Sequence, residues 1–265
     1  MKSARMLRKK IDGNELTLGV LVTMHFWLDL IEIARNAGLD YVILDGEHAA
    51  LDGEKLADAC ALGRMLDFPV LIRPPESQYT PIRLAADAGA CGFLLPQVRG
   101  LGTMDEIRDA LCMAPRGKRR PGGRGNRWVS DYQYQTWKTE VEDDFIVLPQ
   151  IESREGLANA EAIARHELTT ALAVGPYDLS ADLGVCWQPD HPTLVGALDR
   201  IRTAARAAGK NTWMIGDAPT LRQRGFTFLC LAEPSFLLEA TLKNMVSALR
   251  AGGGAAASKS DRPLP

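Results

Sequence analysis

The chain has 265 residues, of which 46% are hydrophobic and 24% are charged, and its formal net charge is −2 at pH 7. These values are ordinary for a globular protein and argue against a general role in binding polyanions such as nucleic acids. No run approaches the ~18 consecutive apolar residues of a membrane-spanning helix, and the first residues lack the apolar core of a signal peptide. We therefore expect a cytoplasmic protein with neither a membrane nor a nucleic-acid partner.

The length suits one large α/β domain or two small ones and is sufficient for a substantial core. The cysteines are odd in number and widely spaced, and none of them form a Cys-x-x-Cys pair: Cys60, Cys91, Cys112, Cys186 and Cys230. Most lie in apolar surroundings, which is typical of reduced, buried thiols and not of a disulfide framework.

Short apolar runs alternate with helical patterns along the chain. After a first helix over 2–11, strands are expected at 18–22, 41–45, 69–73, 91–95, 145–149, 170–174, 211–215 and 226–231. Helices are expected between and after them at 27–37, 53–66, 78–88, 103–113, 154–165, 193–207, 217–224 and 233–249.

Eight strand–helix units predict an α/β fold of the (β/α)8 TIM-barrel type. The alternative, a doubly wound open sheet, would favour a glycine-rich phosphate loop, and the sequence contains neither a GxGxxG nor a P-loop pattern. We expect residues 1–250 to form a single TIM-barrel domain. The tail 251–265 is of low complexity and is expected to be disordered.

A long excursion, roughly 114–144, separates the fourth and fifth strands and combines arginines and glycines with aromatic residues. A loop of this length inside a compact domain is more often functional than idle. We expect it to form a wall of the active-site mouth, where its cations would suit acidic substrates, or a contact with a neighbouring subunit. Nucleic-acid binding is disfavoured because the positive charge does not extend elsewhere.

Polar side chains follow five consecutive strands at the point where each strand ends. They are Asp45, Glu47 and His48 after the second strand, Arg73 after the third, Gln97 after the fourth, Gln150 and Glu152 after the fifth, and Asp178 after the sixth. The carboxyl ends of barrel strands form one face, where TIM-barrel enzymes carry their active sites. Each residue also has a structural interpretation: Arg73 as a salt bridge at the rim, Glu152 as a helix N-terminal carboxylate, and Asp178 as an N-cap.

The residue types narrow the chemistry of such a site. Glu152 and Asp178 offer hard oxygen ligands that suit Mg²⁺ or Mn²⁺. No lysine lies at a predicted strand end, which disfavours Schiff-base aldolase chemistry. Arg73 would hold a carboxylate or an enolate oxygen, and Asp45, three residues before His48, would orient the imidazole as a general base. The set indicates proton abstraction or C–C cleavage next to a carbonyl.

Five motifs in this order resemble the HpcH/HpaI aldolase family, the metal-dependent (class II) pyruvate aldolases, over roughly residues 15–250. They are Asp45-Gly46-Glu47-His48-Ala49, Ile72-Arg73-Pro74-Pro75, Asp87-x-Gly89-Ala90, Pro149-Gln150-Ile151-Glu152-Ser153 and Gly175-Pro176-x-Asp178-Leu179-Ser180. The resemblance points to the 4-hydroxy-2-oxo-heptanedioate or 2-keto-3-deoxyglucarate aldolase type.

The resemblance implies a TIM barrel whose last helix is exchanged between subunits, in a homo-oligomer that is commonly a hexamer built as a trimer of dimers. Glu152 and Asp178 would hold a divalent cation (Mg²⁺, Mn²⁺ or Co²⁺), with Gln150 beside them. His48, paired with Asp45, would be the acid–base group, and Arg73 would neutralise the enolate. Asp87 would lie just outside the ligands, near the subunit contact. Backbone amides near Gly175 and Pro176 would bind the pyruvate carboxylate.

The chain departs from the family pattern on the aldehyde side of the site. Bulky residues, Met24-His25-Phe26-Trp27, follow the first strand where the family tends to carry small ones. The segment Val98–Gly102 replaces a more polar one, and Ala232-Glu233-Pro234 follows the last strand in place of the common Gly-x-Asp type. We therefore expect intact enolate machinery and an altered aldehyde pocket.

Three functions are compatible with these features. The first is a metal-dependent aldolase that reversibly cleaves a 4-hydroxy-2-oxo acid to pyruvate and an aldehyde through a metal-bound pyruvate enolate. The second is a citrate-synthase-like Claisen condensation of oxaloacetate with an acyl-CoA, as in siderophore synthesis, which the basic excursion and the altered rim motivate. The third is a non-enzymatic barrel scaffold with a relict site. The sequence leaves open the aldehyde, the preferred metal and the pathway.

Overall fold

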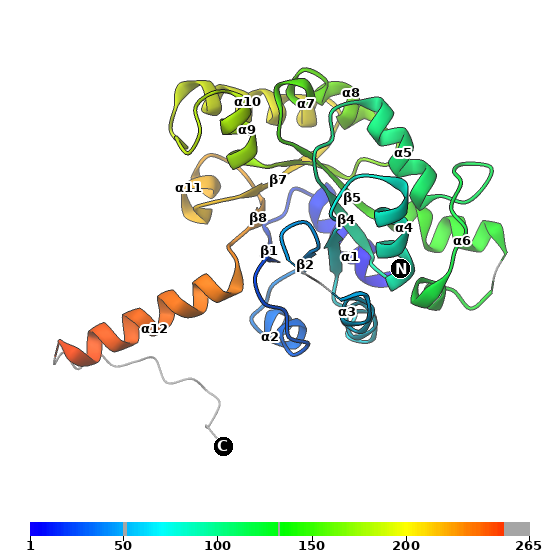
Figure 1. Cartoon of the computed structure of the whole chain (residues 1–265), viewed down its shortest axis with the longest axis horizontal. Helices are drawn as coiled ribbons and strands as arrows, with labels where there is room; N and C mark the ends of the chain where they lie inside the picture. The colour runs from blue at the N-terminus through cyan, green and yellow to red at the C-terminus, as the bar shows by residue number, and fades with distance from the viewer. Residues whose placement is uncertain (50–51, 132, 252–265) are drawn as a thin grey trace.

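The computed structural model describes residues 1–49, 52–131 and 133–251, and within them eight parallel strands close into a barrel in chain order (Figure 1). The strands are β1 (Thr17–Val22), β2 (Tyr41–Asp45), β3 (Val70–Arg73), β4 (Gly92–Leu95), β5 (Ile146–Ile151), β6 (Ala171–Val174), β7 (Asn211–Ile215) and β8 (Phe228–Cys230). The predicted TIM barrel is confirmed. The tail expected to be disordered lies outside the described residues from 252 onward.

The strands are largely apolar because they are covered on both faces, by barrel interior on one side and helices on the other, and several of their polar residues lie at the strand ends. Aromatic side chains fill the barrel. The Tyr41 hydroxyl donates to the Leu229 carbonyl at 2.8 Å and accepts from the Trp213 indole N–H at 2.8 Å, so both polar groups are satisfied in the core. The Phe228 ring meets Tyr41 edge-on with centroids 5.2 Å apart.

Helices surround the barrel (Figure 1). They are α1 (Lys2–Asp12), α2 (Leu30–Asn36), α3 (Gly53–Met65), α4 (Tyr79–Ala88), α5 (Leu101–Leu111), α6 (Tyr134–Glu140), α7 (Arg154–Ala158), α8 (Ala160–Arg165), α9 (Pro176–Asp182), α10 (Pro192–Ala207), α11 (Ala218–Gln223) and α12 (Pro234–Arg250), with 3-10 turns η1 (Gly123–Trp128) and η2 (Glu142–Asp144). Within the described part of the chain, none of these helices combines the length and the apolar character that crossing a membrane requires.

The helix predicted at 154–165 is two helices, because the chain breaks at Asn159. This residue leaves helical geometry with φ −96° and ψ 4°, and its side-chain amide donates to the Arg99 carbonyl at 2.8 Å. An asparagine that hydrogen-bonds outside the helix competes with helix continuation. The expected helix over 27–37 also begins later, at Leu30.

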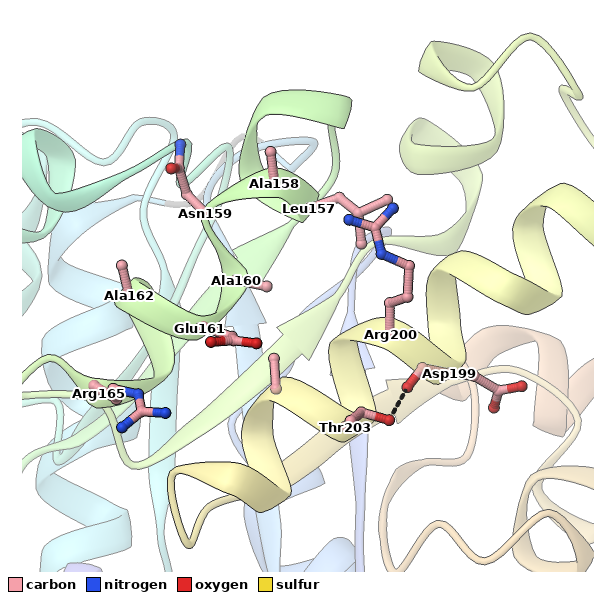
Figure 2. A pocket seen from close by; sticks show the side chains of 11 residues that line it. Leu157, Ala158, Asn159, Ala160, Glu161, Ala162, Arg165, Asp199, Arg200 and Thr203 are labelled. Carbon is pink, nitrogen blue, oxygen red and sulfur yellow. Dashed lines mark hydrogen bonds between the residues drawn. The ribbon is translucent and has the colours of Figure 1, made fainter.

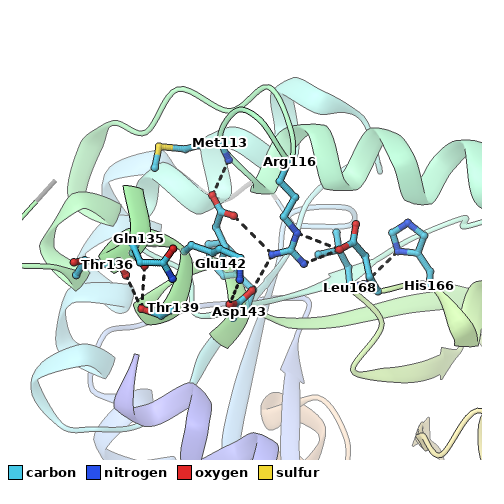
Figure 3. Close-up of polar contacts among 12 residues, drawn as sticks. Met113, Arg116, Gln135, Thr136, Thr139, Glu142, Asp143, His166 and Leu168 are labelled. Atoms are coloured by element: carbon cyan, nitrogen blue, oxygen red, sulfur yellow. Dashed lines mark hydrogen bonds and ion pairs between the residues drawn. The ribbon is translucent and has the colours of Figure 1, made fainter. Parts of the chain in front are cut away.

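The long excursion between α5 and β5 lies at the amino-terminal end of the barrel, because α5 runs antiparallel to the strands and returns the chain there. Its Trp128 indole donates to the Gly89 carbonyl just before β4. The Arg116 guanidinium lies 2.9 Å from Asp143, 3.7 Å from Glu142 and 3.0 Å from Glu167. Figure 3 shows Arg116 facing Glu142 and Asp143. Within one protomer the excursion therefore does not wall the active-site mouth, and the alternative role, a contact with a neighbouring subunit, stays a prediction.

The last helix, α12, stands apart from the other helices. It extends away from the barrel (Figure 1), and none of its residues is buried. Its exposed large apolar side chains are Phe236, Leu237, Leu238, Leu242, Met245, Val246 and Leu249. Contiguous exposed apolar surface of this kind marks an interaction site in soluble proteins.

Candidate functional site

A hollow of about 430 Å³ opens at the carboxyl ends of the strands. Its lining comes from both halves of the barrel: Leu21, Thr23, His48, Arg73, Gln150, Gly175, Pro176, Tyr177, Asp178, Trp213, Ile215, Gly216, Asp217, Leu231, Ala232, Glu233 and Phe236. Most residues that the sequence singled out after strands two, three, five and six are therefore brought together. This is the face on which TIM barrels carry active sites.

Arg73 and Asp45 form a buried ion pair between neighbouring strands. They are register partners at the ends of β2 and β3, and the guanidinium donates through Nε and Nη2 to the two carboxylate oxygens, each at 2.7 Å. Asp45 is fully buried and Arg73 is 5% exposed. Gly46 permits the backbone after β2 to lie close to the end of β3, since a Cβ there would lie 2.9 Å from the Arg73 carbonyl oxygen. This bidentate geometry fixes the direction of the guanidinium.

The predicted pairing of Asp45 with His48 is corrected by these contacts, because Glu47 is the acid that faces His48. The His48 Nε2 lies 3.7 Å from Glu47 Oε2, which is also 3.1 Å from Arg73 Nη1. That oxygen is buried and accepts no hydrogen bond from any described residue. Burial raises the pKa of the Glu47 carboxyl, although the Arg73 and His48 charges oppose the shift.

Glu152 lies beneath the loop that follows β6. Its Oε2 accepts a hydrogen bond from the Gln97 backbone N–H at 2.8 Å, and it is 7% exposed. Burial raises the pKa of Glu152 to about 7; the charges of Glu47 and Asp178 act in the same direction, while the hydrogen bond from Gln97 opposes them. Several carboxylates thus converge in a poorly solvated place, which favours a cation among them.

Gly175 is the point where the β6 loop crosses over these side chains. A Cβ at this position would overlap Glu152 Oε1 and lie 2.8 Å from Gln150 Nε2. The side-chain oxygen of Gln150 is buried and has no hydrogen-bond partner among the described residues. A side chain at this position would therefore displace Glu152 and Gln150. The amide oxygen of Gln150 is free to bind a ligand.

The donor set fits a hard divalent cation. Glu152 and Asp178 supply carboxylate oxygens and Gln150 an unpaired amide oxygen, the ligands that Mg²⁺ and Mn²⁺ prefer. Within the described residues no group of three or more His, Cys, Asp or Glu side chains is arranged to hold a metal alone. Such a cation would therefore need further oxygen ligands from substrate or water. Asp178 lies in the first turn of α9, whose N-cap is Gly175, so the N-cap interpretation of Asp178 is wrong.

Asp87 is not brought to this hollow. It lies near the end of α4, before β4, and so at the amino-terminal end of the barrel. Its carboxylate contacts Arg83 at 2.7 Å and the buried Arg119 at 3.1 Å. Within one protomer it is separated from the other predicted site residues, and its role at a subunit contact stays a prediction.

The sequence analysis gave no role to four lining residues of β7, the loop after it and α12, which are Trp213, Ile215, Asp217 and Phe236, whereas it had named Glu233 among the changes on the aldehyde side. For Ile215 and Asp217 the sequence did carry a signal, because they end or follow a strand just as Arg73 does. Of the segment after β1, Thr23 lines the hollow, whereas Met24 and His25 are exposed. The His25 ring stacks on Trp27 with centroids 6.1 Å apart, which supports a packing role.

A larger groove, of about 640 Å³, lies on the outside of the barrel between α7, α8 and α10 (Figure 2). It is lined by short and charged side chains, among them Glu161, Arg165 and Arg200. It contains none of the residues at the carboxyl ends of the strands. The hollow over Arg73 and Asp178, and not this groove, is the candidate active site.

Known proteins share both the sequence and the architecture. The family model HpcH/HpaI aldolase/citrate lyase matches residues 26–232. A hydroxypyruvate/pyruvate aldolase from Pseudomonas aeruginosa is 33% identical, with 96% of each chain covered. A 4-hydroxy-2-oxo-heptane-1,7-dioate aldolase from Salmonella arizonae is 34% identical over 69% of this chain and 72% of its own. The crystal structure of an HpcH/HpaI aldolase from Desulfitobacterium hafniense superposes with a TM-score of 0.81 at 27% identity, covering 91% and 95%. The chain therefore belongs to the HpcH/HpaI aldolase/citrate lyase family of enzymes.

Proposed function

We propose that this chain is a divalent-metal-dependent aldehyde-lyase that cleaves a 4-hydroxy-2-oxo acid to pyruvate and an aldehyde, and runs the reverse addition. The observation that carries the proposal is the convergence of Glu152, Asp178 and the unpaired Gln150 oxygen beside the Arg73 guanidinium at the barrel mouth. The names of the relatives from Pseudomonas and Salmonella support the same reaction class.

Glu152 and Asp178 would hold the cation, Mg²⁺, Mn²⁺ or Co²⁺, with Gln150 beside them. When bound, the cation would supply Lewis-acid polarisation of the 2-oxo acid. The 2-oxo acid carboxylate is expected next to Gly175 and Pro176, which border the hollow. Arg73, held by Asp45, would place positive charge near the developing enolate oxygen.

In cleavage, His48 would take the proton of the 4-hydroxyl group while the C3–C4 bond breaks and its electrons form the enolate of pyruvate. The enolate then takes a proton at C3, so atoms and charge balance. His48 is exposed at the mouth, within reach of an incoming substrate, and Glu47 lies against its Nε2. Glu47 would therefore be a positioning residue for His48.

Glu47→Gln is expected to lower kcat about 10-fold to 100-fold with little change in KM for the 2-oxo acid, because it weakens the orientation of His48 without touching the ligands of the cation. Glu47→Asp, which keeps the charge, should retain more of kcat. Steady-state kinetics on both variants checks this. Unchanged kcat in Glu47→Gln would contradict a positioning role.

The proposed function is tested by proton exchange at the pyruvate methyl group in D2O, followed by NMR, with Mg²⁺, Mn²⁺ or Co²⁺ added to the protein. Cation-dependent exchange and aldol products with an aldehyde panel are expected. No exchange with any of the three cations would overturn the enolate mechanism. A Glu152→Ala variant that kept all biological activity would instead support the scaffold hypothesis.

The Claisen condensation was considered because of the basic excursion and the altered rim. The excursion no longer supports it, because this segment lies at the far end of the barrel from the hollow. It would use the same enolate-forming residues. Release of citrate from oxaloacetate and an acyl-CoA, measured beside pyruvate release from hydroxy-oxo acids, separates the two reactions.

We also propose that the protein is a cytoplasmic homo-oligomer, a hexamer built as a trimer of dimers, in which α12 packs on a neighbouring subunit. The support is the apolar surface of this helix, which its own barrel leaves uncovered. For the cytoplasm, the support is that the five cysteines are free and four of them are buried.

Leu238→Asp combined with Leu242→Asp is expected to dissociate the assembly, because two charges would enter an apolar contact. Light scattering coupled to size exclusion would show a shift toward monomer. The matched control is Glu239→Gln, which changes an exposed residue of the same helix that pairs with Lys243. A doubly substituted protein of unchanged mass would contradict the packing of α12 between subunits.

A further inference from the structure

The half of the hollow formed by β7, β8 and β1 has no part in the chemistry proposed above. Its surface is largely apolar and comes from Leu21, Trp213, Ile215, Leu231 and Phe236. Trp213 is fully buried in the barrel, and its indole N–H is already satisfied by Tyr41. Apart from the hydroxyl of Thr23 and two carboxylates, the side chains of this half therefore offer an apolar packing surface to a substrate.

The charges on this half are negative. Glu233 is 6% exposed, and its Oε2 accepts from the backbone N–H groups of Ser235 at 2.6 Å and Phe236 at 3.3 Å. Those amides at the start of α12 favour the ionised carboxylate beside the hollow. Asp217 caps α11 by accepting from the Thr220 N–H at 3.0 Å, and these hydrogen bonds lower its pKa.

The positive charge at the mouth is already balanced. Among the described residues that line the hollow, Arg73 is the only lysine or arginine. Two of its nitrogens donate to Asp45, and the third lies 3.1 Å from Glu47. A substrate carboxylate at the aldehyde end would meet two carboxylates and apolar surface, and no described lysine or arginine lining the hollow is free to pair with it.

From this arrangement we infer that the aldehyde partner of the reaction is uncharged, a short apolar or hydroxylated aldehyde, and that Asp217 and Glu233 exclude aldehydes bearing a carboxylate. The inference rests on the proposed aldolase function and specifies its substrate class. An unpaired carboxylate placed on apolar surface loses its hydration, and like charges nearby add repulsion. Selection against a competing substrate by repulsion is a common route to specificity.

The test compares butanal with 4-oxobutanoate, which match in chain length and differ in the terminal carboxylate. With Mn²⁺ and pyruvate, kcat/KM for butanal is expected to exceed that for 4-oxobutanoate about tenfold or more. Asp217→Asn keeps a capping oxygen, and Glu233→Gln keeps the acceptor for the α12 amides. The single variants and the double variant should lower the ratio of kcat/KM for butanal to kcat/KM for 4-oxobutanoate. The matched control Glu161→Gln removes an exposed carboxylate on the outer groove and should leave this ratio unchanged.

Proton exchange at the pyruvate methyl group, measured first on each protein, tests the proposed aldolase function separately from the inferred preference for uncharged aldehydes. Absence of exchange would count against the proposed function itself. Exchange together with equal or better use of 4-oxobutanoate would overturn the inference. A preference for butanal that is unchanged in the double variant would overturn its assignment to Asp217 and Glu233. Weaker discrimination at high salt is expected, because both rim charges are screened there.

Discussion

Gly175→Ala is expected to cost roughly 10-fold to 100-fold in affinity for Mn²⁺ and to remove most of the pyruvate methyl exchange. The added Cβ would overlap Glu152 Oε1 and crowd Gln150 Nε2, so the side chains that converge on the cation site must move apart. Isothermal titration with Mn²⁺ measures the affinity without reference to turnover.

Gly196→Ala is the matched control, because a Cβ at Gly196 in α10 meets no atom within 4 Å. In a helix interior this change is expected to stabilise the fold by roughly 0.5–1 kcal/mol and to leave Mn²⁺ affinity unchanged. Equal Mn²⁺ affinities in the Gly175→Ala and unsubstituted proteins would show that Glu152 and Gln150 do not hold the cation.

Arg73→Met is expected to lower the free energy of unfolding by about 3–5 kcal/mol and to abolish turnover. The first effect arises because the carboxyl group of Asp45 is fully buried and would lose the guanidinium that pairs with it. The second arises because no other described cation lines the hollow. Urea denaturation and steady-state kinetics measure the two losses separately.

Adding Asp45→Asn to Arg73→Met is expected to restore much of the stability and none of the activity, because the buried charge is removed along with its partner. The control is Arg83→Met, which breaks a more exposed pair with Asp87 and should cost less than about 1 kcal/mol. A double variant as unstable as Arg73→Met alone would mean that the arginine stabilises the fold by packing and not by charge.

The barrel was predictable because each strand is a short apolar run followed by a helical pattern, and covered parallel strands are apolar on both faces. The split at Asn159 was not, because a side-chain hydrogen bond to the Arg99 carbonyl joins segments 60 residues apart. The expectation that the excursion at 114–144 walls the mouth failed for a topological reason, since a helix after β4 returns the chain to the amino-terminal end.

The site residues were predictable as a set because strand ends share one face. Their pairings were not. The spacing of Asp45 and His48 suggested a pair, yet Asp45 is the last residue of a strand and its contact is with its register partner Arg73. The acid that lies next to His48 is Glu47, in the loop after β2. Loop positions carry no periodicity from which side-chain direction can be predicted.

The bond between Asp45 and Arg73 joins adjacent barrel strands and also sets the charge of the catalytic centre. Laboratory evolution at these two positions would therefore be limited by folding before it could explore new chemistry. Asp217 is exposed and lies across the mouth in the loop between β7 and α11, so libraries there sample substrate preference without breaking a buried ion pair. New acceptors should be easier to obtain from the β7 side of this barrel than from the β2–β3 side.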